Sequence, residues 1–287
     1  KIPPVPSFEY TRVPETHRGV TKVWQECNWL QALEGGIDSS HAPILHRQIR
    51  EGASSDGIQL STPFVRGGAP TIEVDITDYG YRYTGVRPLG DKEQYVRGYH
   101  FAMPFTQLRP SQIGRAGSPD RAHVDGHHWV PIDDENCYQY RLRYDLNQPL
   151  SAQELNEDKY GGFLFPELIP GTYLTLANKS NDYLVDRVAQ KNYSYTGIKA
   201  FQIQDLALIE DQWGPVSPRT EEHLVSADSA VIRVRQIIMK AARDLMEGTE
   251  PASANNPDAY RVLPTRMTLP GDADVEEALK PYSIPQA

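Results

Sequence analysis

Apolar and polar residues alternate along the middle of the chain, as expected for strands with one buried face. In TIEVDIT (71–77) the apolar residues Ile72, Val74 and Ile76 occupy every second position, which is the period-two pattern of a β-strand. Four further segments of strand character follow, separated by turn-rich sequences: YGYRYTGVR (79–87), QYVRGYHFAMPF (94–105), HHWVPI (127–132) and CYQYRLRY (137–144). Consecutive strands with short connections predict an antiparallel sheet.

Helical patterns flank these strands. Between residues 22 and 50 apolar residues recur at helical spacing, interrupted by a glycine pair and by Pro43. Near the end of the chain, Ser226 or Asp228 can cap a helix that has one wide apolar face and stops at Gly248, because such residues favour helix starts and glycine favours helix ends. We therefore predict an α+β fold with one main domain, a sheet packed against helices.

The two ends of the chain differ from this central domain. Residues 1–20 hold three prolines within the first six positions, which favours an extended linker. Residues 51–70 are rich in Gly, Ser and Pro and predict a surface loop. The last segment carries several prolines, so we expect a loosely packed tail. The predicted division is a linker at 1–20, the domain at 21–250 and a tail at 251–287.

Composition excludes several classes of function. The net charge of -9 argues against a nucleic-acid partner, since such proteins display basic faces. No apolar run approaches the roughly 20 residues that span a membrane. Cys27 and Cys137 could pair, but neither lies in a CxxC motif, and two thiols in a chain of this size fit a reducing cytoplasm better. We expect a cytoplasmic protein without a nucleic-acid or membrane partner.

Asp38, His41 and His46 form a candidate metal site. Two histidines and one carboxylate on one face bind ferrous iron in non-heme oxygenases and leave the opposite face open. His41 and His46 are five residues apart, which on a regular helix turns them roughly 140° away from each other. The spacing therefore requires a break or a bulge in the helix, which Pro43 could cause by removing a backbone donor. Asp38 is placed to hold the second ring nitrogen of a histidine; otherwise the histidines are unrelated surface residues.

The third ligand must come from another part of the chain. The segment FQIQDLALIEDQWGP (201–215) looks helical and contains Asp205, Glu210 and Asp211. A carboxylate in such apolar surroundings is costly to bury without a partner. Spacing alone does not choose among the three acids, and a helix with solvated acids is the alternative.

The motifs together resemble those of the Rieske non-heme iron oxygenases, particularly the large subunit of the phthalate 4,5-dioxygenase type. CNWLQALEGGIDSSHAPILHR is similar to the iron-site segment of that family, which has an Asn-Trp element, an acidic residue and then D-x-x-H-x-x-x-x-H. Four later segments resemble the family in the same order: HHWVPIDDENC, NDYLVDRVAQKNYSYTGI, QDLALIEDQWGPVSPRTEEHL and SADSAVIRVRQIIMKAARDLMEG. The resemblance covers nearly the whole chain.

The resemblance implies a fold and roles for single residues. His41, His46 and Asp205 would be the iron ligands. Asp38 would bridge an iron-ligating histidine to a histidine on the iron–sulfur cluster of the neighbouring subunit. The implied fold is a helix-grip (Bet v 1-like) domain, a curved antiparallel sheet closed around a long C-terminal helix. Glu34 is a departure, because some relatives have asparagine at this position near the iron.

The resemblance also implies cofactors and partners. A mononuclear Fe(II) would activate dioxygen to hydroxylate or O-demethylate an aromatic, carboxylated substrate. Electrons from NAD(P)H would pass through a reductase or ferredoxin and a Rieske [2Fe-2S] cluster, and a homotrimer would bring the cluster of one subunit to the iron of the next. The CxH and CxxH pairs that bind the cluster do not occur in this sequence. We expect them on a Rieske domain that precedes Lys1.

Contacts to the substrate are harder to assign. An aromatic acid needs a cation to bind its carboxylate, and four arginines of the loop and strands are candidates: Arg66, Arg82, Arg87 and Arg97. Arg66, Arg97 and Ser39, which lies beside the candidate ligands, are our predictions. A second group could bind metal independently: His123, His127 and His128 with Asp120 and Asp125.

Two other classes of function stay open at this point. A helix-grip carrier of small molecules would keep a cavity and the long helix without oxygen chemistry. A metal-dependent hydrolase would use the same three ligands to activate water, and it predicts zinc and no electron partner.

Overall fold

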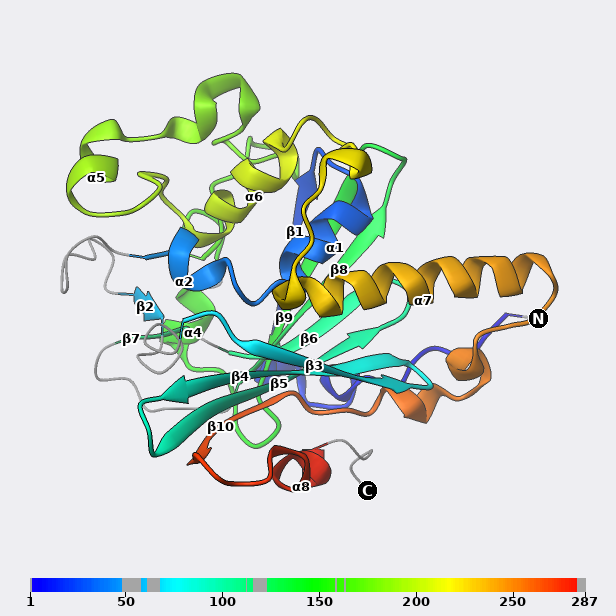
Figure 1. The fold of residues 1–287 in the computed structure, drawn as a ribbon. Helices are drawn as coiled ribbons and strands as arrows, with labels where there is room; N and C mark the ends of the chain where they lie inside the picture. The colour runs from blue at the N-terminus through cyan, green and yellow to red at the C-terminus, as the bar shows by residue number, and fades with distance from the viewer. Residues whose placement is uncertain are drawn as a thin grey trace.

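A curved antiparallel sheet forms the centre of the fold. The computed structural model describes residues 2–47, 58–60, 68–111, 113–115, 123–157, 159–162 and 164–282. In this part of the chain eight strands form one sheet, seven of them in the order β1-β9-β8-β6-β5-β4-β3. Their bounds are β1 (Arg18–Gln25), β3 (Thr71–Thr77), β4 (Gly80–Leu89), β5 (Glu93–Ala102), β6 (Thr106–Pro110), β8 (Val124–Pro131) and β9 (Cys137–Tyr144). Figure 1 shows β3, β4 and β5 lying flat while β1, β8 and β9 rise steeply, so the sheet curves around the helices.

Helices cover the concave face of this sheet. Figure 1 shows four of them above β3–β5: α1 (Trp29–Ile37), α2 (Ala42–Leu45), α6 (Phe201–Asp211) and α7 (Ser229–Met246). Val231 and Val234 of α7 are buried in one core with Leu33 of α1 and Tyr81 and Phe101 of the sheet. The C-terminal turns of α7 extend past the sheet in Figure 1. The predicted α+β, helix-grip fold is confirmed.

The remaining elements are short. They are the strands β2 (Ile58–Leu60) and β7 (Ile113–Arg115), which pair with each other, the helices α4 (Ala152–Glu157), α5 (Arg187–Asn192) and α8 (Val275–Leu279), and the 3-10 helices η1 (Glu9–Thr11), η2 (Glu15–His17), η3 (Lys179–Leu184), η4 (Arg219–Glu221), η5 (Ser226–Asp228), η6 (Ala252–Asn255), η7 (Pro257–Tyr260) and η8 (Lys280–Tyr282). Within the described ranges, no helix is both long and apolar enough to cross a membrane. Cys27 and Cys137 are buried free thiols.

Strand β1 corrects the prediction of a helix from residue 22. Residues 18–25 pair with β9, from Arg18 opposite Tyr144 to Gln25 opposite Cys137. The segment RGVTKVWQ contains β-branched residues that favour a strand, and Val23 is fully buried. The helix begins only at Trp29, where the side chain of Asn28 accepts a hydrogen bond from the Leu30 amide and caps it.

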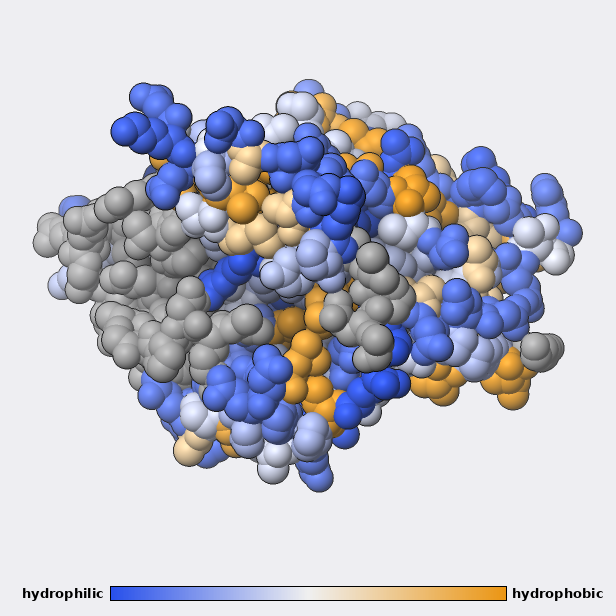
Figure 2. Space-filling view, turned by 90° about the horizontal axis from the view of Figure 1, so that it is seen from below, coloured by the Kyte–Doolittle hydropathy of each residue, from blue (hydrophilic) through white to orange (hydrophobic). Residues whose placement is uncertain are grey.

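Both ends of the chain pack more closely than their prolines suggest. Phe8 is buried against Tyr260. The expected loose tail contributes an eighth strand, β10 (Thr265–Pro270), which pairs with β5 from Thr265 opposite Gly98 to Pro270 opposite Glu93. Strand β6 pairs only with the last three residues of β5, so the rest of that edge is free to bind β10. Figure 2, viewed from the side of β10 and α8, shows a mainly hydrophilic face with a hydrophobic band near its centre.

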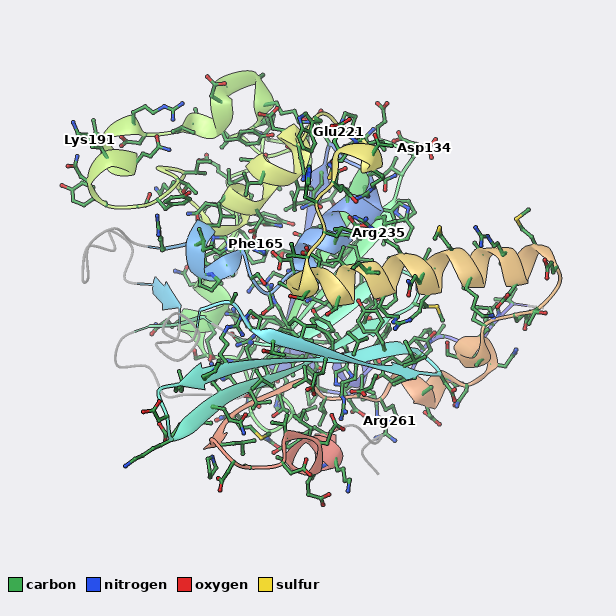
Figure 3. The ribbon with its side chains drawn as sticks, in the orientation of Figure 1. Asp134, Phe165, Lys191, Glu221, Arg235 and Arg261 are labelled. Atoms are coloured by element: carbon green, nitrogen blue, oxygen red, sulfur yellow. The ribbon has the colours of Figure 1, made fainter. Side chains whose placement is uncertain are left out.

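A partly buried ion-pair network joins α1 to α7. Glu34 of α1 binds Arg235 Nε at 2.6 Å and Arg219 Nη1 at 2.7 Å, and Glu222 binds the same two arginines. Figure 3 shows Arg235 on the side of α7 that faces α1. The carboxylate of Glu34 therefore stabilises helix packing.

Candidate metal centre

His41 and His46 lie at the two ends of the short helix α2. His41 immediately precedes the helix and His46 immediately follows it. The turn between them is regular, with the Leu45 amide bonded to the His41 carbonyl at 2.8 Å. Pro43 lies in the first turn, where a backbone donor has no helical partner in any case. Our expectation of a bulge or a distortion by Pro43 was wrong: the spacing is met by one turn with a histidine at each end.

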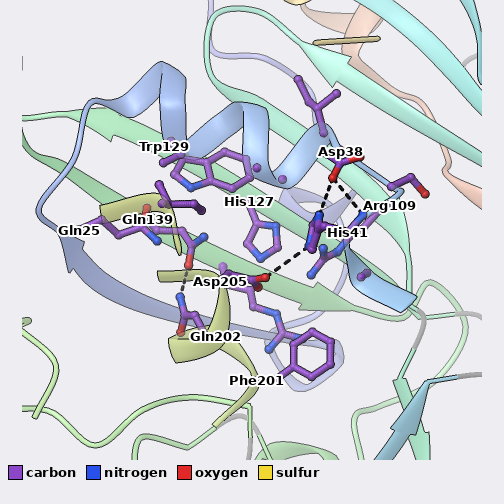
Figure 4. A pocket seen from close by; sticks show the side chains of 18 of the residues that line it. Gln25, Asp38, His41, Arg109, His127, Trp129, Gln139, Phe201, Gln202 and Asp205 are labelled. Atoms are coloured by element: carbon purple, nitrogen blue, oxygen red, sulfur yellow. Dashed lines mark hydrogen bonds and ion pairs between the residues drawn. The ribbon is translucent and has the colours of Figure 1, made fainter. Parts of the chain in front are cut away.

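Asp205 of α6 faces both imidazoles. Its Oδ1 lies 3.1 Å from His46 Nε2 and 3.4 Å from His41 Nε2, as Figure 4 shows in part. The three ligand atoms lie within 4.8 Å of one another, and no other such group of histidine, cysteine and acid occurs in the described part of the chain. Asp205 Oδ1 is buried and makes no hydrogen bond within the described structure. A divalent metal ion would satisfy this oxygen, so the residues fit such an ion.

The other acids of the segment 201–215 point elsewhere. Glu210 accepts hydrogen bonds from the Glu26 amide at 2.7 Å and from the Tyr183 hydroxyl at 2.9 Å. Asp211 is exposed at the end of α6. Of the three candidates for the third ligand, only Asp205 lies within reach of a metal ion bound by both histidines.

A second residue orients each imidazole. Asp38 Oδ2 lies 2.9 Å from His41 Nδ1 and also accepts a hydrogen bond from the His41 amide. His46 Nδ1 donates to Gln204 Oε1 at 2.8 Å, and the His46 ring stacks on Phe201 with centroids 3.6 Å apart. Both Nδ1 atoms are therefore occupied, which leaves both Nε2 atoms for a metal. Gln204 was not predicted from the sequence, although it lies next to Asp205.

The charges of this group are coupled. Burial opposes a proton on His41, but the carboxylates of Asp205 and Asp38 outweigh burial and raise the pKa of His41 to about 10. Burial also opposes the charge of Asp205, but His46 and His41 hold its pKa well below the usual range. The acids therefore stay ionised at neutral pH, as metal ligands must be, and a metal ion would have to displace the proton from His41.

A pocket opens beside these three residues. Its floor consists of side chains from β6, β8 and β9, namely Arg109, His127, Trp129, Gln139 and Arg141. In the sheet register, His127 lies opposite Arg141, and Trp129 lies opposite Gln139, so these side chains share one face. The ends of α1, α2 and α6 form the other wall, and Figure 4 shows His127 between Trp129 and Asp205.

Several buried polar atoms of the pocket have no hydrogen-bond partner in the described structure. They are Arg109 Nε, His127 Nδ1, Trp129 Nε1 and Gln202 Oε1, besides Asp205 Oδ1. Buried polar groups are nearly always paired, so a group of unpaired ones around one pocket indicates a polar ligand. Burial, together with Arg109 and Arg141, holds the pKa of His127 far below its usual value. His127 is therefore a neutral imidazole at neutral pH.

The residues predicted to contact the substrate lie in different places. Ser39 lines the pocket, with its hydroxyl 2.9 Å from the Tyr99 hydroxyl. Arg97 does not line it; its guanidinium is buried against Tyr99 and the Pro110 carbonyl. Arg66 lies outside the described residues. The arginines that do line the pocket, Arg109 and Arg141, were missed.

The other two arginines have structural partners. Arg82 pairs with Asp75 and Glu276, and Arg87 donates to the carbonyl of Ser39.

The histidines of the second predicted cluster do not converge. His123 pairs with Glu154 at 2.8 Å, whereas His128 bonds Tyr10 and Thr106. His127 faces the pocket. Asp120 lies outside the described residues, and Asp125 binds Arg143 at 3.1 Å.

The paired glycines allow α1 to approach the pocket wall. A Cβ atom on Gly36 would lie 2.2 Å from Trp129 Cη2, and one on Gly35 would lie 2.8 Å from Ile209 Cδ1 of α6. The carbonyl of Gly36 also accepts a hydrogen bond from Gln107 of β6 at 2.6 Å. Helix α1 can therefore pack directly on the aromatic ring that forms part of the pocket.

Comparison with known proteins identifies the family. Residues 1–265 match the family model described as LigXa C-terminal domain like. The chain belongs to this family. Among its relatives, the phthalate 4,5-dioxygenase oxygenase subunit of Pseudomonas putida is 31% identical over 93% of this chain and 58% of the relative. The 3-chlorobenzoate-3,4-dioxygenase oxygenase subunit of Comamonas testosteroni is 30% identical over 90% of this chain and 61% of the relative.

These relatives confirm the resemblance to Rieske oxygenases of the phthalate dioxygenase type. The chain spans about three fifths of the length of the two relatives. Among solved structures, NdmA of Pseudomonas putida CBB5 with caffeine has a TM-score of 0.51 at 14% identity, over 94% of this chain and 62% of that chain. At this identity the structural likeness supports the fold alone.

Proposed function

We propose that this chain is the catalytic part of a Rieske-type aromatic oxygenase that hydroxylates or O-demethylates an aromatic acid. The observation that carries the proposal is the convergence of His41 Nε2, His46 Nε2 and Asp205 Oδ1 within 4.8 Å of one another at the edge of a pocket. Two imidazoles and one carboxylate are the ligands that non-heme Fe(II) oxygenases use. Mononuclear Fe(II) held by these three residues would supply the activation of dioxygen.

The residues around the centre have separate tasks in this proposal. Asp38 and Gln204 fix the rings of His41 and His46 so that both Nε2 atoms face Asp205. Trp129, which is 2% exposed, and the Phe201 ring beside His46 provide apolar surface that excludes water and contacts an aromatic ring.

The arginine side of the pocket fits the carboxylate of the substrate. Asp125 accepts hydrogen bonds from Arg141 at 3.3 Å and from Arg143 at 3.1 Å. Arg109 Nε, by contrast, has no hydrogen-bond partner among the described residues. A buried guanidinium with an unpaired donor favours an anion. The names of the two relatives, which act on phthalate and 3-chlorobenzoate, agree with an aromatic acid.

Electron delivery requires partners in this proposal. The side chain of Asp38 is 23% exposed while its carboxylate holds His41, so a histidine of another domain can approach it from solvent. We assign this place to the Rieske [2Fe-2S] cluster of a neighbouring subunit in a homotrimer. A cytoplasmic reductase or ferredoxin would reduce the cluster with electrons from NAD(P)H.

Anaerobic reconstitution tests the metal centre. The chain should bind one Fe(II), and Asp205→Ala should lose it, whereas the matched change Asp211→Ala on the exposed end of α6 should not. With a Rieske cluster and a reductase supplied, oxygen uptake should depend on an aromatic acid. Full occupancy by zinc with turnover that needs no reductant would instead identify a hydrolase, and acid binding without any metal would identify a carrier.

A further inference from the structure

The pocket has a second polar side, which the proposed oxygenase function does not by itself explain. Three glutamine side chains line it, from three different elements: Gln25 of β1, Gln139 of β9 and Gln202 of α6. All three are buried, with exposed fractions of 1%, 7% and 9%. Buried amides are costly unless their hydrogen bonds are formed, so their presence in one wall calls for an explanation.

The hydrogen bonds within this amide cluster leave a buried oxygen of Gln202 without a donor in the described structure. Gln202 Nε2 donates to Gln139 Oε1, and Gln25 Oε1 lies 3.7 Å from the thiol of Cys137. Gln202 Oε1 is buried and has no partner within the described structure. The amide pair of Gln139 and Gln202 therefore presents an unfilled hydrogen-bonding position to the pocket.

The amide cluster and the cationic side flank the metal centre. Figure 4 shows Gln25, Gln139 and Gln202 together on one side and Arg109 on the other, with His127 and Asp205 between them. A ring whose carboxylate contacts Arg109 would therefore extend past the candidate ligands toward the amides.

We propose that Gln139 and Gln202 form a subsite for a hydroxyl group on the ring of an aromatic acid, and that this hydroxyl donates a hydrogen bond to Gln202 Oε1. The aromatic acid is taken from the proposed function; the subsite rests on the amides. A purely apolar substituent would leave Gln202 Oε1 buried without a partner. A second carboxylate would place a charge beside neutral amides, while the nearby Arg141 already binds Asp125. The pocket therefore selects a monoanion with one neutral polar group.

Equilibrium binding to the Fe(II)-loaded full chain without oxygen tests this inference. The ligands are benzoate, the three hydroxybenzoates and the three benzenedicarboxylates, measured by calorimetry. We expect the best hydroxybenzoate to bind about fivefold more tightly than benzoate, the contribution of one net hydrogen bond of about 1 kcal/mol. It should also bind more tightly than every dicarboxylate.

Two substitutions locate the effect. Gln202→Met keeps the side-chain volume and should reduce the ratio of hydroxybenzoate affinity to benzoate affinity to about one. Gln139→Met is the second variant if the first does not fold. Arg109→Met should weaken benzoate and hydroxybenzoate binding by the same factor and leave their ratio unchanged. A hydroxyl preference that survives in both glutamine variants, or tighter binding of a dicarboxylate, overturns the inference.

The design separates this inference from the proposed function. If the aromatic acids bind but a hydroxyl group does not increase their affinity, only the amide subsite is refuted. If no aromatic acid binds while Fe(II) does, the proposed substrate class fails together with the subsite.

Discussion

Gln204 Oε1 accepts a hydrogen bond from His46 Nδ1 at 2.8 Å, so the helix that supplies the third candidate ligand also orients the second. The next residue of α6, Asp205, faces the opposite nitrogen of the same ring at 3.1 Å. Gln204 is itself held by the Ile198 carbonyl, to which its Nε2 donates at 2.9 Å. Helix α6 therefore contacts His46 on both nitrogens.

Gln204→Leu should weaken metal binding by about 10–100-fold, as expected when a residue that orients a histidine ligand is lost. The substitution removes the acceptor of the His46 proton, so the imidazole can rotate or change tautomer. Competition with a chelator for Co(II) or Fe(II) measures the affinity. Gln236→Leu on the exposed side of α7 is the control and should have no effect. Unchanged affinity in Gln204→Leu would show that Phe201 and Asp205 orient the ring without it.

Gly36→Ala should destabilise the protein by about 1–3 kcal/mol, the usual cost of overpacking a core. Its Cβ would lie 2.2 Å from Trp129 Cη2, and Trp129 is too deeply buried to move aside. Gly35→Ala is the matched control, because its Cβ meets only the flexible end of Ile209. Urea unfolding measures both variants. Equal stability of the two would contradict the close contact between α1 and Trp129.

Glu210 predicts a pH dependence of stability. Burial raises the pKa of Glu210 to about 7, although the Glu26 amide and Tyr183 oppose this. A carboxyl whose pKa is higher in the folded than in the unfolded protein contributes most stability below the unfolded value of about 4.5, and this contribution is lost as the pH rises through about 7. Glu210→Gln removes the ionisation and should stabilise the protein at pH 8, relative to pH 5, by about 2–3 kcal/mol.

Unfolding in urea at the two pH values provides the measurement for Glu210→Gln. Glu221→Gln is the control, because Glu221 is an exposed acid at the end of η4, and it should show no such difference. A Glu210→Gln effect that is the same at pH 5 and pH 8 would mean that the carboxyl stays ionised in the folded protein.

The strands were predictable because their information is local. TIEVDIT and CYQYRLRY form β3 and β9 with the predicted bounds, since alternation along one strand is enough to identify a buried face. β1 was missed because Trp24 fits a helical spacing as well as a strand. β10 was missed because its stability comes from pairing with β5, far away in the sequence.

The same limit applies to the candidate metal centre and its pocket. His41, His46 and Asp38 lie within nine residues, so their pattern is visible in the sequence, and Asp205 entered through the family resemblance. Arg109 was not predicted, because its place in the pocket depends on the register in which β6, β8 and β9 pair. Gln202 could not be recognised from the chain, since its role depends on its hydrogen bond to Gln139, which comes from a strand far away in the sequence.

Asp38→Asn separates metal binding from electron delivery. Asparagine keeps one oxygen, which can accept from the His41 amide and from His41 Nδ1 as Asp38 Oδ2 does at 3.0 and 2.9 Å, and it loses the oxygen Oδ1, which accepts from the Ser40 amide at 2.7 Å. Fe(II) stoichiometry should therefore stay at one, while turnover with the reductase and Rieske cluster should fall by about 10–100-fold, because the charged contact to His41 is lost. Iron analysis and oxygen uptake measure the two effects.

The control is Asp211→Asn, which removes a carboxylate of α6 that does not face the histidines, and it should leave both quantities unchanged. If Asp38→Asn lost iron in proportion to turnover, Asp38 would act only by holding His41 in place. If it kept iron and full turnover, electrons would enter at another point of the surface, and the docking place proposed beside Asp38 would be wrong.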